Sequence, residues 1–202
     1  MTLIDTESAL RALYAEPGER AVRKQLDRLD THCRRFIALS PFIVLASADE
    51  AGRADASPRG GEPGFVKVLD ERTLLIPDSK GNNRLDSLAN LIRRPGVGLL
   101  FLIPGVDETL RVNGEAVIST DAALIEQCDA GRHRPKLVLR VAVREAYLHC
   151  AKSLMRAKLW DPAARNERSV LPSMNQMIKD QIGQAGEPES EEAMRARYRE
   201  DL

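Results

Sequence analysis

The stretch LLIPDSKGNNRLDSLANLI, residues 74–92, changes from strand-like to helix-like sequence within a single turn. Its first four residues are apolar and predict the end of a strand, whereas residues 83–92 carry apolar side chains at helical spacing. The apolar positions of that predicted helix are Leu85, Leu88, Leu91 and Ile92. The turn between strand and helix contains two cations, Lys80 and Arg84, which raises the question of what anion it holds.

The turn has the composition of a phosphate-binding site. Free backbone N–H groups at a helix start favour an anion, and Gly81 allows close approach of the backbone. The planar guanidinium of Arg84 suits phosphate oxygens. Asn83 is the predicted N-cap, with Asp86 at the third helical position. The alternative is that both cations are solvated charges beside a capped helix. Neither a Walker-type nor a Rossmann glycine motif is present.

Strand-like segments surround this turn. Residues 53–64 are polar and interrupted by Pro and Gly, so we expect a loop there. Most connections are too short for a helix after each strand, which excludes a parallel α/β sheet. The pattern predicts a mainly β fold with flanking helices (α+β), arranged as a six-stranded antiparallel barrel. The predicted strands are 42–48, 65–69, 73–77, 97–105, 109–119 and 136–148.

Helical patterns occupy both ends of the chain. Residues 5–39 and 150–160 have helical periodicity, 121–128 form a short helix, and the tail from Ala185 is a charged helix or frayed. We therefore expect three parts. Residues 1–40 would be helices that pack on the barrel, 41–160 the barrel domain, and 161–202 a C-terminal helical extension.

Composition excludes several classes of function. The 202 residues include 30 basic and 30 acidic ones, so a basic face for nucleic acid is not expected. No run of about 20 apolar residues could span a membrane, and the N-terminus lacks the order of a secretory signal. Cys33, Cys128 and Cys150 have no C-x-x-C spacing, so we expect reduced thiols, a cytoplasmic location and no metal site.

Three further cations lie in unusual surroundings. Arg59 precedes two glycines, and Lys67 lies between Phe65 and Leu69 on one face of a predicted strand. The alternative for Lys67 is an edge-strand lysine that prevents aggregation. Arg111 points to the opposite face from the apolar residues of its strand. The alternative to a binding role for Arg111 is a surface ion pair with Glu115.

The segments ASPRGGEPGF (56–65), LLIPDSKGNNRLDSLANLIRRPGVGLLFLIPG (74–105), ETLRVNGEA (108–116) and AYLHCAKSLMRAKLW (146–160) appear in this order and spacing. Together they resemble the FMN-binding split-barrel family related to pyridoxamine 5′-phosphate oxidase, over about residues 40–160. The resemblance implies a six-stranded antiparallel split β-barrel and a homodimer. It also implies FMN in a groove at the dimer interface, with contacts from both chains.

The resemblance also implies residue roles. Arg59 and Lys67 are similar in position to an Arg and Lys that bind the FMN phosphate, although they lie eight residues apart. Lys80, Asn83 and Arg84 are similar to a second phosphate-binding element, and Gly60 belongs to a segment suited to backbone contacts with the flavin. The chain ends without the R-x-H motif that binds substrate in the oxidase. The expected cofactor-binding residues are Arg59, Gly60, Lys67, Ser79, Lys80, Asn82, Asn83, Arg84 and Arg111.

A second group of residues predicts a substrate site. If 150–160 is helical, then His149, Lys152 and Arg156 share a face, and Trp160 follows four residues later. This face could bind an anionic substrate, or it could meet carboxylates of the N-terminal helices.

We expect an FMN-dependent oxidoreductase acting on an unidentified small molecule, with no catalytic residue assigned. The alternatives are a non-catalytic flavin-binding or flavin-sensing protein, and a split-barrel binder of heme or a deazaflavin.

Overall fold

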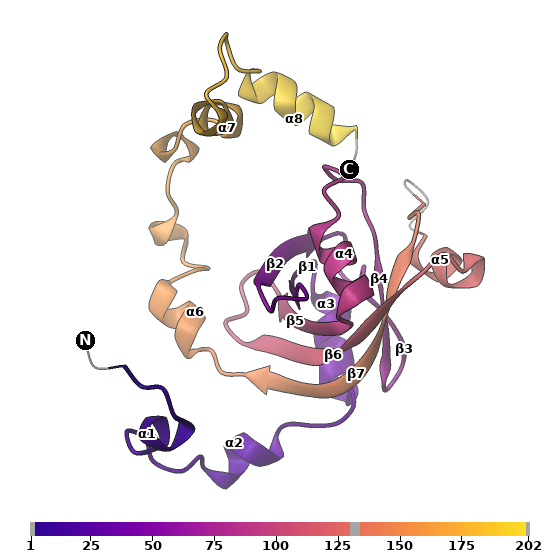
Figure 1. The fold of residues 1–202 in the computed structure, drawn as a ribbon, viewed down its shortest axis with the longest axis vertical. Coiled ribbons are helices and arrows are strands. Elements are labelled where there is room, and N and C mark those ends of the chain that lie inside the picture. Colours follow the sequence, from indigo (N-terminus) through magenta and orange to yellow (C-terminus); the bar gives the residue numbers. More distant parts are fainter. Residues whose placement is uncertain (1–2, 130–133, 201–202) are drawn as a thin grey trace.

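The computed structural model describes residues 3–129 and 134–200, and its centre is one strongly curved antiparallel sheet (Figure 1). The order of the strands is β2-β1-β5-β6-β7-β4-β3, and each pair of neighbours is antiparallel. The strands are β1 (Phe42–Ala48), β2 (Ala54–Gly60), β3 (Lys67–Asp70), β4 (Thr73–Pro77), β5 (Gly96–Leu102), β6 (Thr109–Ser119) and β7 (Val138–His149).

The mainly β, antiparallel character of the fold is confirmed, but the predicted strand number is wrong. The sheet has seven strands and is not closed, so β2 and β3 lie at its edges. The additional strand is β2, within the segment expected to be a loop. Its half-buried residues are polar, namely Asp55, Ser57 and Arg59, whereas Ala56 and Pro58 are exposed. An edge strand tolerates Pro58 because one row of its N–H groups has no partner strand.

The main core lies on the concave side of the sheet. Alternate residues of β1, β5 and β6 point there, as the two-residue period of a strand requires. Helix α3 (Thr31–Leu39) adds Cys33, Phe36 and Ile37, and α4 (Asp86–Arg93) adds Leu88 and Leu91. Leu85 and Ile92, predicted on the same helical face, are instead 55% and 75% exposed.

A second, smaller cluster lies under α5 (Ala122–Cys128), outside the main core. Leu75 and Val138 of the sheet pack there against Ile125 and Cys128. Burial raises the pKa of the Cys128 thiol, and burial next to Asp30 raises that of Cys33 to about 12. Both of these buried thiols are therefore protonated at neutral pH. The third cysteine, Cys150, is exposed to solvent.

The remaining helices form two arms outside the sheet. In the N-terminal arm, α1 (Glu7–Arg11) and α2 (Glu19–Arg23) bury none of their residues. The C-terminal arm contains α6 (Lys152–Ala157), the 3₁₀ turns η1 (Pro162–Ala164) and η2 (Arg168–Val170), α7 (Met174–Ile182) and α8 (Glu191–Arg199). In Figure 1 the N-terminal arm lies at the lower left, and the C-terminal arm runs up the left of the sheet to α8 above it. In the described parts of the chain, no helix is long and apolar enough to span a membrane.

Gly114 is required by the packing of β6 on β7. The pairing of these strands shifts register between Asn113 and Gly114, and a Cβ at Gly114 would lie 2.1 Å from the carbonyl oxygen of Ala142. Because that neighbour is backbone, it cannot move aside as a flexible side chain can.

We expect Gly114→Ala to lower the free energy of unfolding by about 3 kcal/mol or more, at the upper end of overpacking effects. Gly96→Ala on the neighbouring strand is the control, since a Cβ there meets nothing within 4 Å. Urea unfolding measures both. Equal stabilities for the two variants would contradict this role of Gly114.

Candidate anion site at the open edges of the sheet

The loop of residues 78–85 connects β4 to α4 and contains the predicted phosphate-binding turn. The helix begins at Asp86, so the prediction of Asn83 as N-cap is wrong. The N-cap is Leu85, and both Asn83 (φ 61°) and Leu85 (φ 60°) have left-handed backbone conformations. Such conformations are unfavourable for a bulky residue such as leucine. The turn thus holds a shape that its local sequence does not favour.

The polar residues of this loop face solvent. Ser79, Lys80, Asn82 and Arg84 are exposed. The Nε of Arg84 lies 2.7 Å from Oδ2 of Asp86, and its backbone N–H donates to Oδ1 of Asn82 at 3.1 Å. The Asp86 carboxylate raises the pKa of the Arg84 guanidinium. Because the Arg84 side chain is 73% exposed, its pairing with Asp86 leaves it accessible to a ligand.

Arg59 is the most enclosed of the predicted phosphate ligands. It extends from β2 to the start of the loop, where its NH1 donates to Oδ1 of Asp78 at 3.1 Å. The side chains of Arg59 and Asp78 are only 20% and 18% exposed. The Nε of Arg59 is buried and has no hydrogen-bond partner among the described residues. This ion pair joins β2 and the end of β4, which are not neighbours in the sheet.

Lys67 lies apart from this ion pair. Its Nζ donates to the carbonyl oxygen of Gly64 at 3.0 Å. Its register partner Leu75 belongs to the cluster under α5, whereas Arg59 is in register with Ile43 of the main core. Paired residues of neighbouring strands point to the same face of a sheet. The structure therefore directs these two cations toward different clusters.

Arg111 lies on the outer, convex face of β6 and is exposed. Its guanidinium carbon is 5.1 Å from the ring centroid of Tyr147, a cation–π contact, and Lys24 approaches the same ring at 5.7 Å. Glu115, the alternative partner predicted for Arg111, instead accepts a hydrogen bond from Arg144 at 3.0 Å. Gly60 is the exposed last residue of β2.

The predicted substrate residues belong to two different elements. His149 is the last residue of β7, so the prediction that it shares a helical face with Lys152 and Arg156 is wrong. Helix α6 spans Lys152–Ala157, with both cations exposed. Trp160 lies beyond the helix, and its Nε1 donates to the carbonyl oxygen of Val106 at 2.9 Å. A role for these residues in substrate binding stays a prediction.

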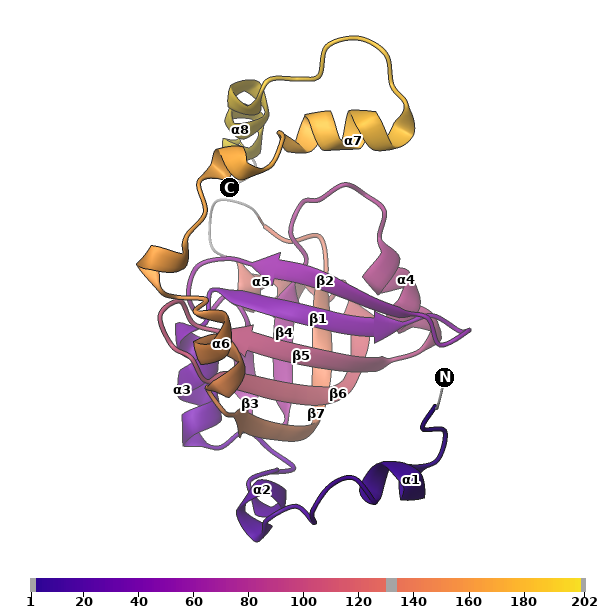
Figure 2. The same cartoon turned by 90° about the vertical axis from the view of Figure 1, so that its left-hand side faces the viewer.

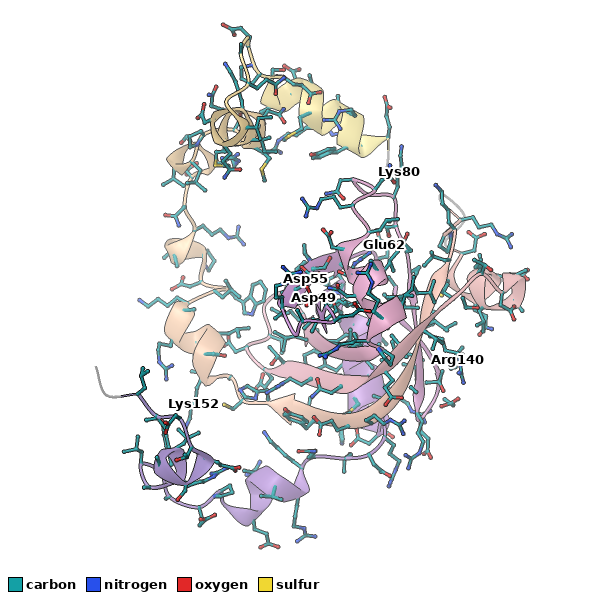
Figure 3. All side chains as sticks on the ribbon, viewed as in Figure 1. Asp49, Asp55, Glu62, Lys80, Arg140 and Lys152 are labelled. Atoms are coloured by element: carbon teal, nitrogen blue, oxygen red, sulfur yellow. The ribbon has the colours of Figure 1, made fainter. Side chains whose placement is uncertain are left out.

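The two predicted groups are separated within one chain. Figure 3 shows Lys80 on the loop at the top of the sheet and Lys152 on α6 at the lower left. The sheet lies between them. The two groups therefore lie at different places on one chain.

Sequence reasoning missed the polar contacts that fix α4. Oγ of Ser87 donates to Oδ2 of Asp55 at 2.9 Å, and Nδ2 of Asn90 donates to Oγ of Ser47 at 3.1 Å. These bonds hold the helix that follows the turn against β1 and β2. In the sequence, Asp55, Ser57 and Arg59 alternate with small residues, and this pattern could have indicated a strand with a polar inner face.

The described residues contain no group of three His, Cys, Asp or Glu that could hold a metal ion. A shallow hollow of about 240 Å³ lies between α3 and β3, lined in part by Arg34, Ile37, Val66 and Lys67.

A family model for pyridoxamine 5′-phosphate oxidase matches residues 29–150, more than half of the chain. No curated protein sequence matches. Among solved structures, HupZ from Group A Streptococcus is 18% identical, with 59% of this chain and 92% of that chain covered and a TM-score of 0.48. An FMN-binding protein from Syntrophomonas wolfei is 13% identical, with coverage of 58% and 83% and a TM-score of 0.47. The heme storage protein HutZ from Vibrio cholerae is 15% identical, with coverage of 60% and 94% and a TM-score of 0.42.

We expect Asp78→Asn to lower the free energy of unfolding by about 1.5–3 kcal/mol, because it removes the charged acceptor of a mostly buried guanidinium. Glu115→Gln is the control, since Glu115 pairs with Arg144 and their side chains are 51% and 66% exposed. Thermal or urea unfolding of both variants measures the difference. A loss for Asp78→Asn no larger than for the control would show that the ion pair does not stabilise the contact of β2 with the end of β4.

Proposed function

Because the chain belongs to the pyridoxamine 5′-phosphate oxidase family, we propose that it is an FMN-binding flavoprotein whose phosphate site is formed by Arg59 and the loop 78–85. The observation that carries this proposal is the buried Nε of Arg59, which has no hydrogen-bond partner among the described residues. Leaving a buried donor unsatisfied costs about 1–3 kcal/mol. A phosphate oxygen would satisfy it.

The residues around Arg59 fit a phosphate. One side of the guanidinium is used by Asp78, and the planar fork of the remaining donors suits the oxygens of a phosphate. The loop that starts at Asp78 carries Lys80 and Arg84 within six residues, which adds positive charge on flexible side chains. Lys67 is directed elsewhere, so this proposal does not need it in the phosphate site.

FMN, when bound, supplies the electron transfer of an oxidoreductase. In this proposal Arg59 orients the phosphate end, and Arg84 shifts from Asp86 to the phosphate. Lys152 and Arg156 are exposed on α6 and would attract an anionic substrate. The reaction we propose is oxidation or reduction of a small molecule. No group of the chain is assigned as general acid or base.

We further propose a homodimer formed through the outer face of the sheet. Residues in register across β2, β1 and β5 present Pro58, Val44 and Leu100 on this face, and Phe42 is 37% exposed beside them. A contiguous apolar face is typical of a protein–protein interface. A second copy seated there would bring its own α6 toward the phosphate site, and would resolve the separation of Lys80 from Lys152.

We predict that the purified protein binds FMN at least about tenfold more tightly than riboflavin, because charge-assisted bonds to phosphate contribute roughly 1.5–3 kcal/mol each. Arg59→Ala and Arg84→Ala should each weaken FMN binding about 10- to 100-fold and leave riboflavin binding nearly unchanged. Flavin fluorescence titration measures all six affinities, two for each of the three proteins.

Arg53→Ala is the matched control, since Arg53 lies just before β2 and its side chain is 84% exposed. Lys152→Ala should also retain FMN affinity while losing affinity for an anionic substrate. Equal affinities for FMN and riboflavin would overturn the phosphate site. If the purified protein shows the absorption spectrum of heme or of a deazaflavin instead of that of FMN, the result would favour that cofactor over FMN.

We predict a dimer at micromolar concentration by light scattering. Leu100→Glu, at the centre of the outer face, should convert it to a monomer, because an unpaired charge would be buried in the interface. Val117→Glu is the control, since Val117 is a 54% exposed residue of β6 that lies beyond the end of β5. A wild-type monomer would contradict the assembly.

A further inference from the structure

The C-terminal arm ends in a small packed unit of its own. Nδ2 of Asn175 in α7 donates to the carbonyl oxygen of Glu189, just before α8, at 3.0 Å. Arg168 of η2 forms an ion pair with Glu191 of α8 at 3.8 Å. Met194 of α8 is only 8% exposed. The unit is thus ordered by its own contacts, although it stands away from the sheet in Figures 1 and 2.

This unit exposes an apolar stripe. Met174, Ile178 and Ile182 follow each other at intervals of four residues on α7, so they lie on one helical face. They are 47%, 44% and 66% exposed, and Leu171, just before the helix, is 57% exposed. Three large apolar side chains on one face of a short helix, with a fourth exposed just before it, are typical of a surface that packs against another body.

The outer face of the sheet lies between the two arms. In Figure 2, β2, β1, β5 and β6 lie in front, with α7 and α8 above them and α1 and α2 below. In Figure 1, α1 lies at the lower left of the sheet and α6 at its left, and the chain continues to α7 at the upper left and α8 above the sheet. A second copy seated on the face would therefore meet both arms.

The area of the face supports this arrangement. Four strands about 4.8 Å apart, taken over the seven residues that β2, β1 and β5 each have at about 3.4 Å per residue, form a patch of about 460 Å². A stable interface buries about 800 Å² on each partner. The sheet face alone is about half of that, so additional surface must come from elements that flank it.

We propose that the C-terminal arm is exchanged between two copies of this chain, with the stripe of α7 packed against the partner. In a twofold dimer each copy gives one arm and receives one, so the stripe of each chain is covered reciprocally. The inference rests on the homodimer of the proposed function, and it does not depend on FMN.

The test places a photo-crosslinking benzoylphenylalanine at position 178 of the full-length protein. Copies labelled with ¹⁵N are mixed with unlabelled copies, dissociated, refolded together and irradiated. We expect a covalent dimer that joins the residue 178 peptide of one isotope to a peptide of the other. Crosslinks confined to one chain, or no crosslink at all in a protein that is dimeric by light scattering, would overturn the exchange and leave the dimer intact.

A second variant keeps the test independent of the crosslinker. Replacing Ile178 and Ile182 together by Gln preserves helix propensity and should raise the dissociation constant of the dimer at least tenfold. Asp180→Gln, on another face of the same helix, is the matched control and should leave it unchanged. An unaltered dissociation constant in the double variant would also overturn the proposal. A monomeric wild type would overturn both this inference and the proposed dimer, whereas loss of FMN binding alone would overturn only the cofactor assignment.

Discussion

The unclosed sheet is the constraint on which the rest of the structure depends. Seven strands curve around one core without joining, so the edge strand β2 has polar residues where a closed barrel would have apolar ones. Its inward residues meet polar partners, with Asp55 bonded to Ser87 and Arg59 to Asp78. The guanidinium of Arg59 is thereby held in a mostly buried position, where its Nε has no hydrogen-bond partner among the described residues. The candidate phosphate site is a consequence of how the edge strand β2 approaches the end of β4.

Strands β6 and β7 could be predicted from the sequence because their apolar residues alternate with a period of two, and β1, β4 and β5 because they are short apolar runs. Strand β2 could not be predicted in this way. Its buried positions are Asp55, Ser57 and Arg59, and its exposed ones include Pro58, which reverses the usual pattern of a strand. Polar residues are tolerated inside because each can meet a specific partner across the gap, and partners distant in sequence are not visible from composition. The extra strand therefore appeared as a loop.

The candidate site could be predicted only in part, again because contacts between residues distant in sequence determine the rest. The turn after β4 and its cations could be located from residue types, but the left-handed conformations of Asn83 and Leu85 move the helix start to Asp86. His149 was placed on a helix because its spacing to Lys152 and Arg156 fits one, yet the pairing of β6 with β7 extends the strand through His149. Local periodicity cannot show where a long strand pairing ends. The separation of the two predicted groups depends on tertiary structure, and so does the position of the arms around the outer face. In our account both also depend on a second chain.

The central claim is that Arg59 and the loop after β4 hold the phosphate of FMN. A crystal structure of the protein with FMN tests it most directly. The account predicts a phosphate oxygen within about 3 Å of the Nε of Arg59, with Arg84 turned from Asp86 toward the phosphate. A flavin whose phosphate lies away from Arg59, with the Arg59–Asp78 pair unchanged and the loop as it is here, would contradict the account.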